Sequence, residues 1–362
     1  MKTAIEWAER GLLPDVLIRL GIRRLLRGRL ARQNRGHCRI QQEDKLRLVE
    51  EMRRSAVALH TDEANVQHYE VPPEFFVQVL GKRLKYSSCY YDGGAANLNE
   101  AEDHMLALTC KRAELENGMD ILELGCGWGS LTLWMAEHYP ASRITAVSNS
   151  AAQREFIERR CRARHLDNVQ VVTADVNKFV SADQYDRVVS VEIFEHLRNY
   201  AAMLERVAGW LRPQGKVFIH VFCHRDYAYL FETDGDNDWM GRHFFTGGLM
   251  PSDDLLLYFQ DHLALEQHWR VDGSNYARTA EDWLLCLNTA RSELEDIFAR
   301  DFSKEEAQTQ VQRWRMFFMA CAELFGYKKG QEWWVAHYLL SKKAVADMSA
   351  DAAPVVAVGD AV

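Results

Sequence analysis

Residues 119–139 read MDILELGCGWGSLTLWMAEHY, and the pattern of the chain changes there. The apolar beginning of this stretch predicts a buried strand, and its final third predicts a helix. Three glycines, Gly125, Gly127 and Gly129, lie between the two. Because glycine has no side chain, the backbone of such a turn can come close to a bound molecule. The stretch therefore predicts the first strand, turn and helix of an α/β domain, with a ligand at the turn.

The same alternation continues towards the C-terminus. Strands that alternate with helices predict a doubly wound, parallel α/β sheet. We therefore assign residues 118–223 to a Rossmann-like core. Apolar runs that predict further strands lie at 142–148, 168–175, 185–192 and 216–222, with helical segments at 151–166 and 200–215 between them.

The segments on either side of this core are predicted to be mainly helical. Residues 1–117 form a helical N-terminal segment that covers the site, and residues 224–342 form a lid-like insertion with helices. Two closing strands are predicted within this second segment, at 263–272 and 332–343. The remainder, 343–362, has no charge pattern or periodicity, and we expect a flexible tail.

Composition excludes several classes of protein. The 362-residue chain has a net charge of -8, so it lacks the basic surface expected of a nucleic-acid-binding protein. It contains no apolar run near the ~20 residues that a membrane span needs. Glu6 and Glu9 stand where a signal peptide would have its apolar core. With eight cysteines that form no CxxC pair, these features favour a cytoplasmic protein.

One segment, LIRLGIRRLLRGRLARQNR at 17–35, is strongly basic. It is predicted to be a surface helix that packs Leu20, Leu25, Leu26 and Leu30 on the body of the protein. The alternative is weak contact with an anionic membrane surface. The first interpretation is favoured, because long arginine side chains commonly cover apolar surface.

The spacing of the glycines narrows the choice of ligand. A dinucleotide-binding turn reads G-x-G-x-x-G and has an acidic residue about 20 residues further on. Here the spacing is G-x-G-x-G, and the second strand runs into Ser148, Asn149 and Ser150. A nicotinamide cofactor is therefore disfavoured. No Gly-Lys-Ser/Thr follows the turn, which excludes a Walker phosphate loop.

Acidic residues gather at the end of the fourth predicted strand. Residues 186–200 read DRVVSVEIFEHLRNY, so an apolar strand leads directly to Glu192, Glu195 and His196. Ligands of open α/β sheets bind outside the carboxyl ends of the strands, which favours a functional site. The alternative is an ordinary helix N-terminus, where glutamates interact favourably with the helix dipole.

Several motifs together resemble one enzyme superfamily. HYEVPPEFFVQVLGKRLKYSSCYY, ELGCGWGS, VSNSAAQ, VSVEIFEHLRNY, HFFTGGLMPS and SNYARTAEDW occur in the order seen in the cyclopropane-fatty-acid synthase superfamily. RWRMFFMACAELFGYKKGQEWWVAHYLL is similar to the coclaurine N-methyltransferase-like branch of it. The resemblance implies a class I methyltransferase fold with S-adenosylmethionine (SAM) as methyl donor, S-adenosylhomocysteine as product, and no metal.

The resemblance also implies which residues bind SAM. The segment Lys85–Ser88 would close over the methionine carboxylate, and Asp175 would contact the adenine. For Asp175 the alternative role is a helix cap. The implied cofactor-binding residues are Tyr86, Ser87, Glu123, Gly125, Gly127, Asn149, Gln153, Asp175 and Val176.

Two positions separate the lipid and amine branches of the superfamily. Cyclopropane synthases have a glycine at the position of Glu192 and a cysteine at that of Ser88, where they bind bicarbonate. Glu192 would fill this space and repel an anion, although Glu195, His220 and Tyr276 match the bicarbonate contacts. The resemblance thus implies N-methylation of a small amine, such as a coclaurine-type alkaloid. The alternatives are a cyclopropane-fatty-acyl-phospholipid synthase or lipid C-methyltransferase, and a SAM-binding protein without catalysis.

Methyl transfer to an amine requires a free lone pair on the nitrogen, so a nearby base is useful. Glu192, Glu195 and His196 are the predicted catalytic residues. Two close carboxylates raise the pKa of one of them, which favours a base.

The acceptor pocket is predicted from the same resemblance and from the aromatic loop at 224–254. Three aromatic residues of that loop, Trp239, Phe244 and Phe245, are equally consistent with plain core. A metal site at His220 and His224 is disfavoured, because they would lie about 13 Å apart on one extended strand. The sequence leaves the oligomeric state open, with a homodimer as one option. The predicted acceptor-pocket residues are Ser88, His220, Trp239, Phe244 and Tyr276.

Overall fold

The computed structural model describes residues 2–59, 71–235 and 238–343. Its centre is a seven-stranded sheet in the order β3-β2-β1-β4-β5-β9-β8. All but the first residue of the predicted tail lie outside the described residues. The strands of this sheet are β1 (Asp120–Leu124), β2 (Arg143–Ser148), β3 (Val169–Thr173), β4 (Tyr185–Val191), β5 (Leu211–His224), β8 (Leu263–Val271) and β9 (Trp333–Lys342).

Strands β1 to β5 are parallel, as the alternation of strands and helices predicts. The two strands predicted near the C-terminus are both present and extend the sheet beyond β5. β9 pairs antiparallel with β5, and β8 pairs antiparallel with β9. The predicted doubly wound α/β fold is therefore confirmed.

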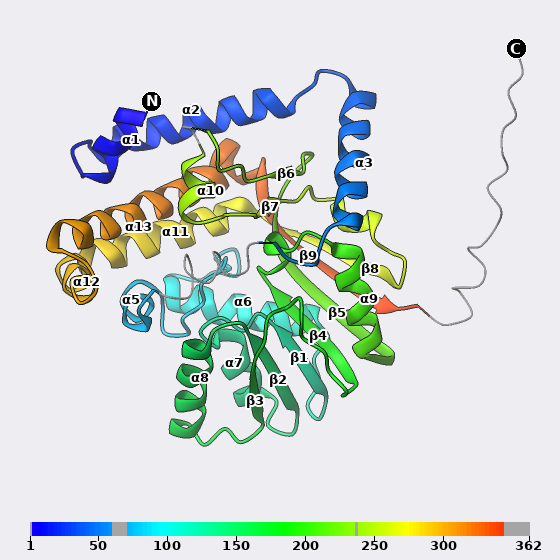
Figure 1. Ribbon diagram of the computed structural model, residues 1–362. Coiled ribbons are helices and arrows are strands. Elements are labelled where there is room, and N and C mark those ends of the chain that lie inside the picture. Colours follow the sequence, from blue (N-terminus) through cyan, green and yellow to red (C-terminus); the bar gives the residue numbers. More distant parts are fainter. Residues whose placement is uncertain (1, 60–70, 236–237, 344–362) are drawn as a thin grey trace, which may run out of the picture.

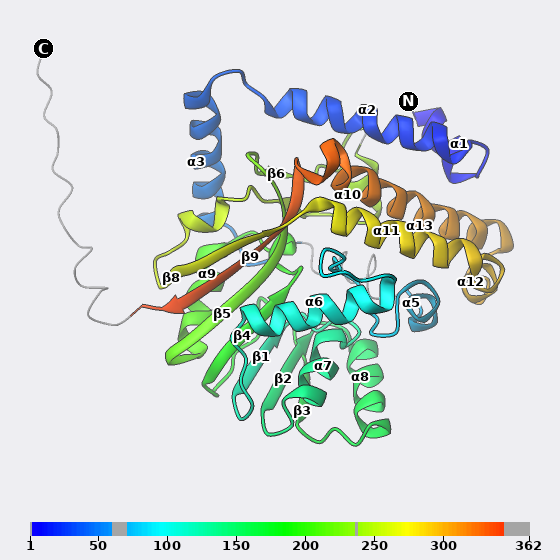
Figure 2. The same ribbon diagram turned by 180° about the vertical axis from the view of Figure 1, so that it is seen from behind.

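Helices cover both faces of the sheet (Figures 1 and 2). Because side chains alternate between the faces of a strand, neighbouring residues of β4 belong to different layers. Val188 packs with α3 and α9, whereas Val189 packs with α6 and α7. α8 packs on the edge formed by β2 and β3. The helices of the two layers are α3 (Cys38–Arg54), α6 (Leu98–Arg112), α7 (Ser130–His138), α8 (Ala151–Ala163) and α9 (Tyr200–Trp210).

The remaining helices form a separate layer beyond the sheet, with α11 and α13 packed side by side (Figures 1 and 2). α2 crosses over α13, and α5 packs on α11. The loop after β5 contains the short strands β6 (Tyr229–Leu230) and β7 (Leu249–Met250). The helices of this layer are α1 (Lys2–Glu9), α2 (Asp15–Gln33), α5 (Pro73–Val79), α10 (Trp239–His243), α11 (Gly273–Thr289), α12 (Arg291–Phe298) and α13 (Lys304–Phe325).

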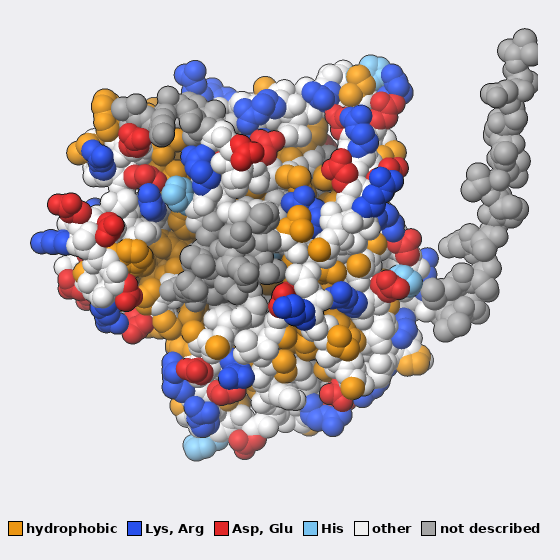
Figure 3. Space-filling view, in the orientation of Figure 1, with side chains coloured by type: hydrophobic (Ala, Val, Ile, Leu, Met, Phe, Trp, Pro, Cys, Tyr) orange, Lys and Arg blue, Asp and Glu red, His pale blue; other side chains and the backbone are white. Residues whose placement is uncertain are grey.

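α2 is the predicted basic helix, and ion pairs attach it to the helices beneath it. Arg19 donates to Glu281 of α11 and to Glu323 of α13. Arg23 also donates to Glu323. Figure 3 shows Lys and Arg side chains along the upper edge of this face of the molecule, over α2 and α3.

The leucines of α2 behave differently from one another. Leu26 and Leu30 pack against the core, and Leu25 is partly buried, as the surface-helix interpretation predicts. Leu20 was predicted to pack as well, but it is 49% exposed, because it lies on the outer side of the helix. In the described part of the chain, no helix has the length and apolar character needed to cross a membrane.

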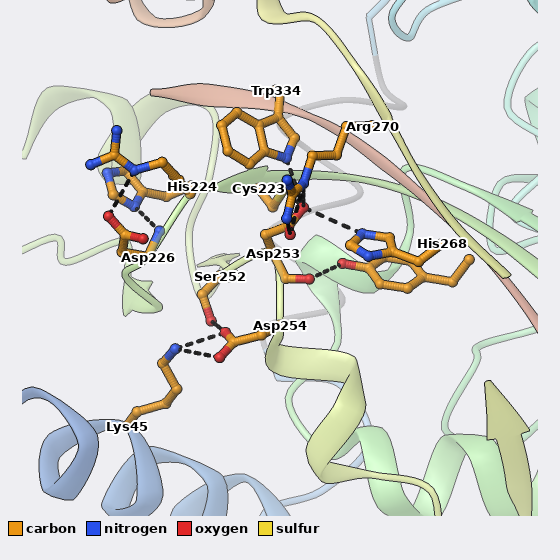
Figure 4. Close-up of polar contacts among 12 residues, drawn as sticks. Lys45, Cys223, His224, Asp226, Ser252, Asp253, Asp254, His268, Arg270 and Trp334 are labelled. Atoms are coloured by element: carbon orange, nitrogen blue, oxygen red, sulfur yellow. Dashed lines mark hydrogen bonds and ion pairs between the residues drawn. The ribbon is translucent and has the colours of Figure 1, made fainter. Parts of the chain in front are cut away.

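A buried carboxylate, Asp253, connects the last two strands of the sheet to the loop that precedes them (Figure 4). It accepts hydrogen bonds from Trp334 Nε1 of β9 at 2.8 Å and from Arg270 Nη2 of β8 at 2.7 Å. The next residue, Asp254, pairs with Lys45 of α3 at 2.7 Å. These contacts join β8 and β9, at the far edge of the sheet, to helix α3 through residues 253 and 254.

Candidate active site

A cavity of about 230 Å³ lies outside the carboxyl ends of the parallel strands. One half of it is bounded by the ends of β1, β2, β3 and β4 and carries polar side chains. The other half is bounded by α10, α11 and α13 and is mainly apolar. The polar half includes Glu123, Asn149, Gln153, Asp175 and Glu192, and the apolar half includes Phe222, Phe231, Met240, Phe245, Phe317 and Phe325.

The glycine turn keeps the polar half open. Gly125 has a φ of +79°, and a Cβ atom there would lie 2.1 Å from Ile193 Cδ1. Only glycine fits both the backbone angle and the space. At Gly127, with a φ of +50°, nothing lies within 4 Å of the position that a Cβ would take. A ligand can therefore approach the backbone of this turn closely, as the sequence predicts.

Polar groups surround the space next to this turn. Glu123, at the end of β1, is buried and accepts a hydrogen bond from Thr132 Oγ1. Burial raises the pKa of Glu123 to about 7, and the Thr132 hydrogen bond opposes that rise. At the end of β2, Ser148 Oγ donates to Gln153 Oε1 at 2.6 Å. These contacts hold the polar side chains in defined positions at the cavity wall.

Asp175 has two roles in the structure. It lines the cavity together with Asn149 and Val176. Its Oδ1 also accepts a hydrogen bond from the backbone N–H of Asn177 at 2.8 Å, which stabilises the turn after β3. A turn and no helix follows Asp175 in residues 174–184, so Asp175 is not a helix cap, and its contact with the turn is compatible with a place at the cavity wall.

The segment Lys85–Ser88 reaches the cavity from the loop before α6. Glu102 of α6 is buried, and its carboxylate accepts hydrogen bonds from three backbone N–H groups within residues 81–85. This contact fixes the path of the loop. Tyr86 and Ser87, which follow directly, line the cavity.

Glu192 follows β4 and has a φ of +50°, which is uncommon for a residue other than glycine. Its carboxylate accepts hydrogen bonds from Ser88 N at 3.0 Å and Tyr276 Oη at 2.7 Å. His220 Nε2 lies 3.2 Å from Glu192 Oε1. Burial raises the pKa of Glu192, while the charge of Lys85 and the hydrogen bonds work against that rise. The carboxylate is therefore held at the cavity wall by donors from three elements.

The other two predicted catalytic residues, Glu195 and His196, differ from each other in their position relative to the cavity. Glu195 is fully buried, does not line the cavity, and accepts a hydrogen bond from Phe222 N at 2.8 Å. Burial, and then the charge of Glu192, raise the pKa of Glu195 far above its usual value, which favours its neutral form. His196 lines the cavity and stacks on Phe245 with ring centroids 4.9 Å apart. Glu192 and His196 thus face the cavity, and Glu195 lies behind its wall.

Residues 58–333, well over half of the chain, match the mycolic acid cyclopropane synthetase family. The chain belongs to this family. It is a SAM-dependent methyltransferase, with S-adenosylhomocysteine as the product of its cofactor.

Within the family, this methyltransferase groups with the coclaurine N-methyltransferase-like branch. It is 37% identical to the (S)-coclaurine N-methyltransferase of Thalictrum flavum subsp. glaucum over 343 residues, which cover 92% of this chain and 94% of that protein. It is 28% identical to the cyclopropane-fatty-acyl-phospholipid synthase of Escherichia coli (strain K12) over 272 residues, 74% of this chain and 66% of that protein. The crystal structure of a coclaurine N-methyltransferase bound to N-methylheliamine and S-adenosylhomocysteine matches with a TM-score of 0.90 and 35% identity, covering 94% and 99% of the two chains.

Two residues of the predicted acceptor pocket lie elsewhere in this methyltransferase. Trp239 is buried, and its Nε1 donates to Glu9 Oε1 of α1 at 2.8 Å. Phe244 stacks on Phe317 with ring centroids 4.3 Å apart. Neither residue lines the cavity. Both pack in the core beside the cavity, Phe244 directly against the lining residue Phe317, and their role towards an acceptor stays a prediction.

The other predicted pocket residues divide between the cavity and the wall behind it. Tyr276 lines the cavity. Ser88 and His220 are buried and do not line it; the backbone N–H of Ser88 and the Nε2 of His220 contact Glu192 instead. The loop side of the cavity is formed by Met240, one residue beyond Trp239, and by Phe245, the third aromatic residue considered in that loop.

Helix α13 contributes side chains to the cavity that the sequence did not predict. Phe317, Cys321, Leu324 and Phe325 line the cavity from this helix. Their spacing of i, i+4, i+7 and i+8 is the signal of one helical face. The same spacing is typical of any face buried in a core, so it could not assign these residues to a ligand.

The sequence disfavours a metal site at His220 and His224, and the structure shows what these side chains contact. His224 Nδ1 accepts hydrogen bonds from the backbone N–H groups of Asp226 and Tyr227 (Figure 4). Within residues 2–59, 71–235 and 238–343, no group of three His, Cys, Asp or Glu side chains is arranged to hold a metal ion.

Proposed function

We propose that this methyltransferase methylates the nitrogen of a small, largely apolar amine, with coclaurine-type alkaloids as the favoured substrate class. The observation that carries the proposal is the position of Glu192, a residue of the polar half whose carboxylate accepts a hydrogen bond from Tyr276 of α11, at the boundary with the apolar half. A negative charge at that boundary suits an amine with an apolar body.

The polar half of the cavity fits the cofactor. SAM supplies an electrophilic methyl group when it is bound. Gly127 leaves space at the backbone turn, which a side chain would fill, and Gly125 lets Ile193 pack against the same turn. Glu123, Gln153 and Asp175 present polar groups on the same side. These residues would hold the cofactor and leave the apolar half for the acceptor.

Glu192 provides what an amine acceptor needs. An aliphatic amine is mostly protonated at neutral pH and must lose a proton before its lone pair can react. The Glu192 carboxylate attracts the cationic amine and accepts that proton. Because burial raises the pKa of Glu192, its proton affinity is closer to that of an efficient general base at neutral pH.

The apolar half suits an aromatic amine. Phe222, Phe245, Tyr276, Phe317 and Phe325 line it. Aromatic rings attract a cation by ~0.5–2 kcal/mol each when they face it, and they also pack against the apolar body of an alkaloid. The names of the similar proteins point the same way, since they include coclaurine, pavine and tetrahydroprotoberberine N-methyltransferases.

The donors around Glu192 argue against the lipid alternative. By resemblance, cyclopropane synthases hold a bicarbonate with groups equivalent to His220, Tyr276 and the segment at Ser88. Here all three contact the carboxylate of Glu192. An added anion would meet both a filled space and a like charge.

A labelling experiment tests the proposal. The protein is incubated with methyl-labelled SAM and either a panel of secondary and tertiary amines, including coclaurine-type compounds, or vesicles of unsaturated phospholipids. We expect label in the amine alone, and much less label with Glu192→Gln. Label in the lipid alone would contradict the proposal, and SAM binding without any transfer would indicate a non-catalytic protein.

A further inference from the structure

A chain of buried side chains connects Glu192 to the α6 side of the sheet. His220 of β5 and His337 of β9 are cross-strand partners, and both are fully buried. His220 Nε2 lies 3.2 Å from Glu192 Oε1, and His220 Nδ1 lies 2.9 Å from His337 Nε2. His337 Nδ1 lies 2.8 Å from Arg112 Nη1, at the end of α6. The guanidinium of Arg112 also lies over Trp269 of β8, 5.0 Å from the ring centroid.

The hydrogen-bond partners and the burial of the two imidazoles in this chain both favour their neutral form. Burial is the largest cause, and it lowers the pKa of His220 and of His337 well below 6.5. The positive charges of Lys85 and Arg112 act in the same direction on both rings. A neutral imidazole has one nitrogen that donates and one that accepts.

Arg112 therefore determines the direction of every hydrogen bond in the chain. A guanidinium can only donate, so His337 Nδ1 accepts and His337 Nε2 carries the proton. That N–H donates to His220 Nδ1, which leaves the His220 proton on Nε2. The Nε2–H of His220 then donates to Glu192 Oε1.

We propose that Arg112 and His337 are positioning residues of the methyl-transfer site, which hold His220 in the one tautomer that donates to Glu192. The inference rests on the proposed function for its catalytic meaning, although the tautomers themselves do not depend on it. Neither residue lines the cavity.

The tautomer of His220 matters because its Nδ1–H form would reverse the direction of the hydrogen bond between His220 and Glu192. If His220 carried its proton on Nδ1, its Nε2 could only accept, and Glu192 would have to be protonated to bond with it. A donor to a carboxylate favours its charged form, whereas an acceptor favours the neutral acid. Loss of Arg112 therefore weakens Glu192 as a base at low pH and leaves it competent at high pH.

Other titratable groups lie near Glu192 and His337, and their own protonation contributes to any measured pH profile. Those that face Glu192 are Lys85 and Cys89 from the loop before α6, Glu195 after β4, His220 from β5, Tyr276 from α11 and Cys321 from α13. Those that face His337 are His220, Arg112, Lys85 and His268.

The first test reads the tautomers directly. The full chain is labelled with ¹⁵N-histidine, and long-range ¹H–¹⁵N correlation spectra distinguish Nε2–H from Nδ1–H rings. His337→Phe and His220→Gln assign the two signals among the 13 histidines. We expect both rings to be neutral Nε2–H tautomers at pH 7.5. An Nδ1–H or a doubly protonated ring at either position would overturn the proposal, whether or not the protein methylates amines.

The second test is kinetic, with amine turnover measured from pH 6 to pH 9.5. Arg112→Met removes the donor, and we expect kcat/KM to fall about tenfold at the low end while it stays near wild type at the high end, an apparent pKa shift of about one unit. His337→Phe keeps the Arg112 charge but breaks the chain, so it should give the same profile. Arg112→Lys still donates and should restore the wild-type profile.

The matched control is Lys111→Met, which removes a charge from the exposed neighbouring residue. Its profile should equal that of wild type. If Lys111→Met shifts the profile as much as Arg112→Met does, the effect is one of net charge and the proposal fails. A uniform loss at all pH values in both Arg112→Met and His337→Phe would also contradict it, because that result indicates misplacement and not a change of tautomer.

Discussion

Glu192 and Asp253 are both buried carboxylates that receive hydrogen bonds from several elements, yet their pKa values move in opposite directions. Burial alone would raise the pKa of Asp253, but hydrogen bonds from His268, Arg270 and Trp334 hold it far below its usual value. Glu192 receives its contacts from Ser88, Tyr276 and His220, and burial raises its pKa. The number of donors is similar, so it does not explain the difference.

The charge of the donors explains it. Arg270 is a cation and makes charge-assisted hydrogen bonds to Asp253, which stabilise the carboxylate strongly. Around Glu192 the hydrogen-bond donors are neutral, and the nearest cation, Lys85, is itself buried. One arrangement makes a permanent anion that joins strands, and the other keeps a carboxylate able to take up a proton beside a cavity.

Glu192→Gln should have the largest effect of any change that tests this contrast. The amide has nearly the same shape but cannot act as a base or carry charge, so we expect kcat/KM for the amine to fall by about 10²–10⁴. The melting temperature should change little, because a buried carboxylate with a raised pKa does not stabilise the fold. Wild-type turnover in this variant would remove Glu192 from the mechanism.

A second variant at the same position sharpens the result. Glu192→Gly removes the side chain and leaves Ser88 N–H, Tyr276 Oη and His220 Nε2–H directed at an empty space. Added acetate should bind there and restore part of the amine turnover, with no such gain for Glu192→Gln, whose side chain blocks the space. Equal responses of the two variants to acetate would contradict this picture.

Glu123 should resemble Glu192, because its hydrogen-bond donor, Thr132, is neutral. Its pKa is raised by burial from the usual 4.5 to about 7. The folded protein therefore holds a proton that the unfolded chain releases above pH 4.5, and stability falls as the pH rises from about 4.5 to about 7. The loss due to Glu123 is about 3 kcal/mol.

Chemical denaturation at pH 5 and pH 8 measures this effect, with Glu123→Gln as the comparison. The glutamine variant should lose less stability between the two pH values than wild type does. Because Glu192 and Glu195 contribute losses of the same sign in both proteins, only the difference between them is diagnostic. Parallel pH dependence in the two proteins would show that Glu123 is not perturbed.

Asp253→Asn should show the opposite behaviour to Glu192→Gln. The unfolding free energy should fall by about 1–3 kcal/mol at pH 7, because Arg270, Trp334 and His268 lose their acceptor charge. Amine kcat should remain near wild type in the protein that stays folded. A depressed pKa gives stability above the usual Asp pKa of 3.8 that is lost as the pH falls, so the two proteins should converge in acid.

Lys45→Met has the smallest expected effect on stability. It tests whether the contrast between Glu192 and Asp253 depends on their burial. Lys45 pairs with Asp254, next to Asp253, but 41% of the Asp254 side chain is exposed (Figure 4). Solvent screens such a pair, so we expect a loss of about 0–1 kcal/mol in urea unfolding. A loss as large as that of Asp253→Asn would mean that burial does not govern these contacts.

The parts of the site that lie close together in the sequence were predictable. Gly125 and Glu192 follow buried strands, and the position of a strand end is set by local pattern. Met240 and Phe245 line the cavity where Trp239 and Phe244 do not, because a shift of one residue on α10 or its loop decides which side chain faces the cavity. The pattern of apolar and polar residues cannot distinguish between two neighbouring positions in such a loop.

Longer-range contacts were not predictable for a different reason. Arg112 and His337 are separated by 225 positions in the chain, and only the packing of α6 on β9 brings them together. Leu20 has the apolar character of Leu26 but lies on the opposite side of α2. Both results depend on the angle at which a helix meets the sheet or another helix, which composition does not specify.

The left-handed backbone of Glu192 has a consequence for anyone who engineers this enzyme for robustness. A residue with a Cβ is strained in that conformation by roughly 1–2 kcal/mol, and glycine is not. Glycine at position 192 also removes a buried ionisable group. Because glycine also leaves the donors of Ser88, Tyr276 and His220 without their acceptor, it gains heat resistance only where water pairs with them. A laboratory selection that recovers glycine there discards amine turnover, so any such library needs an activity screen at every round.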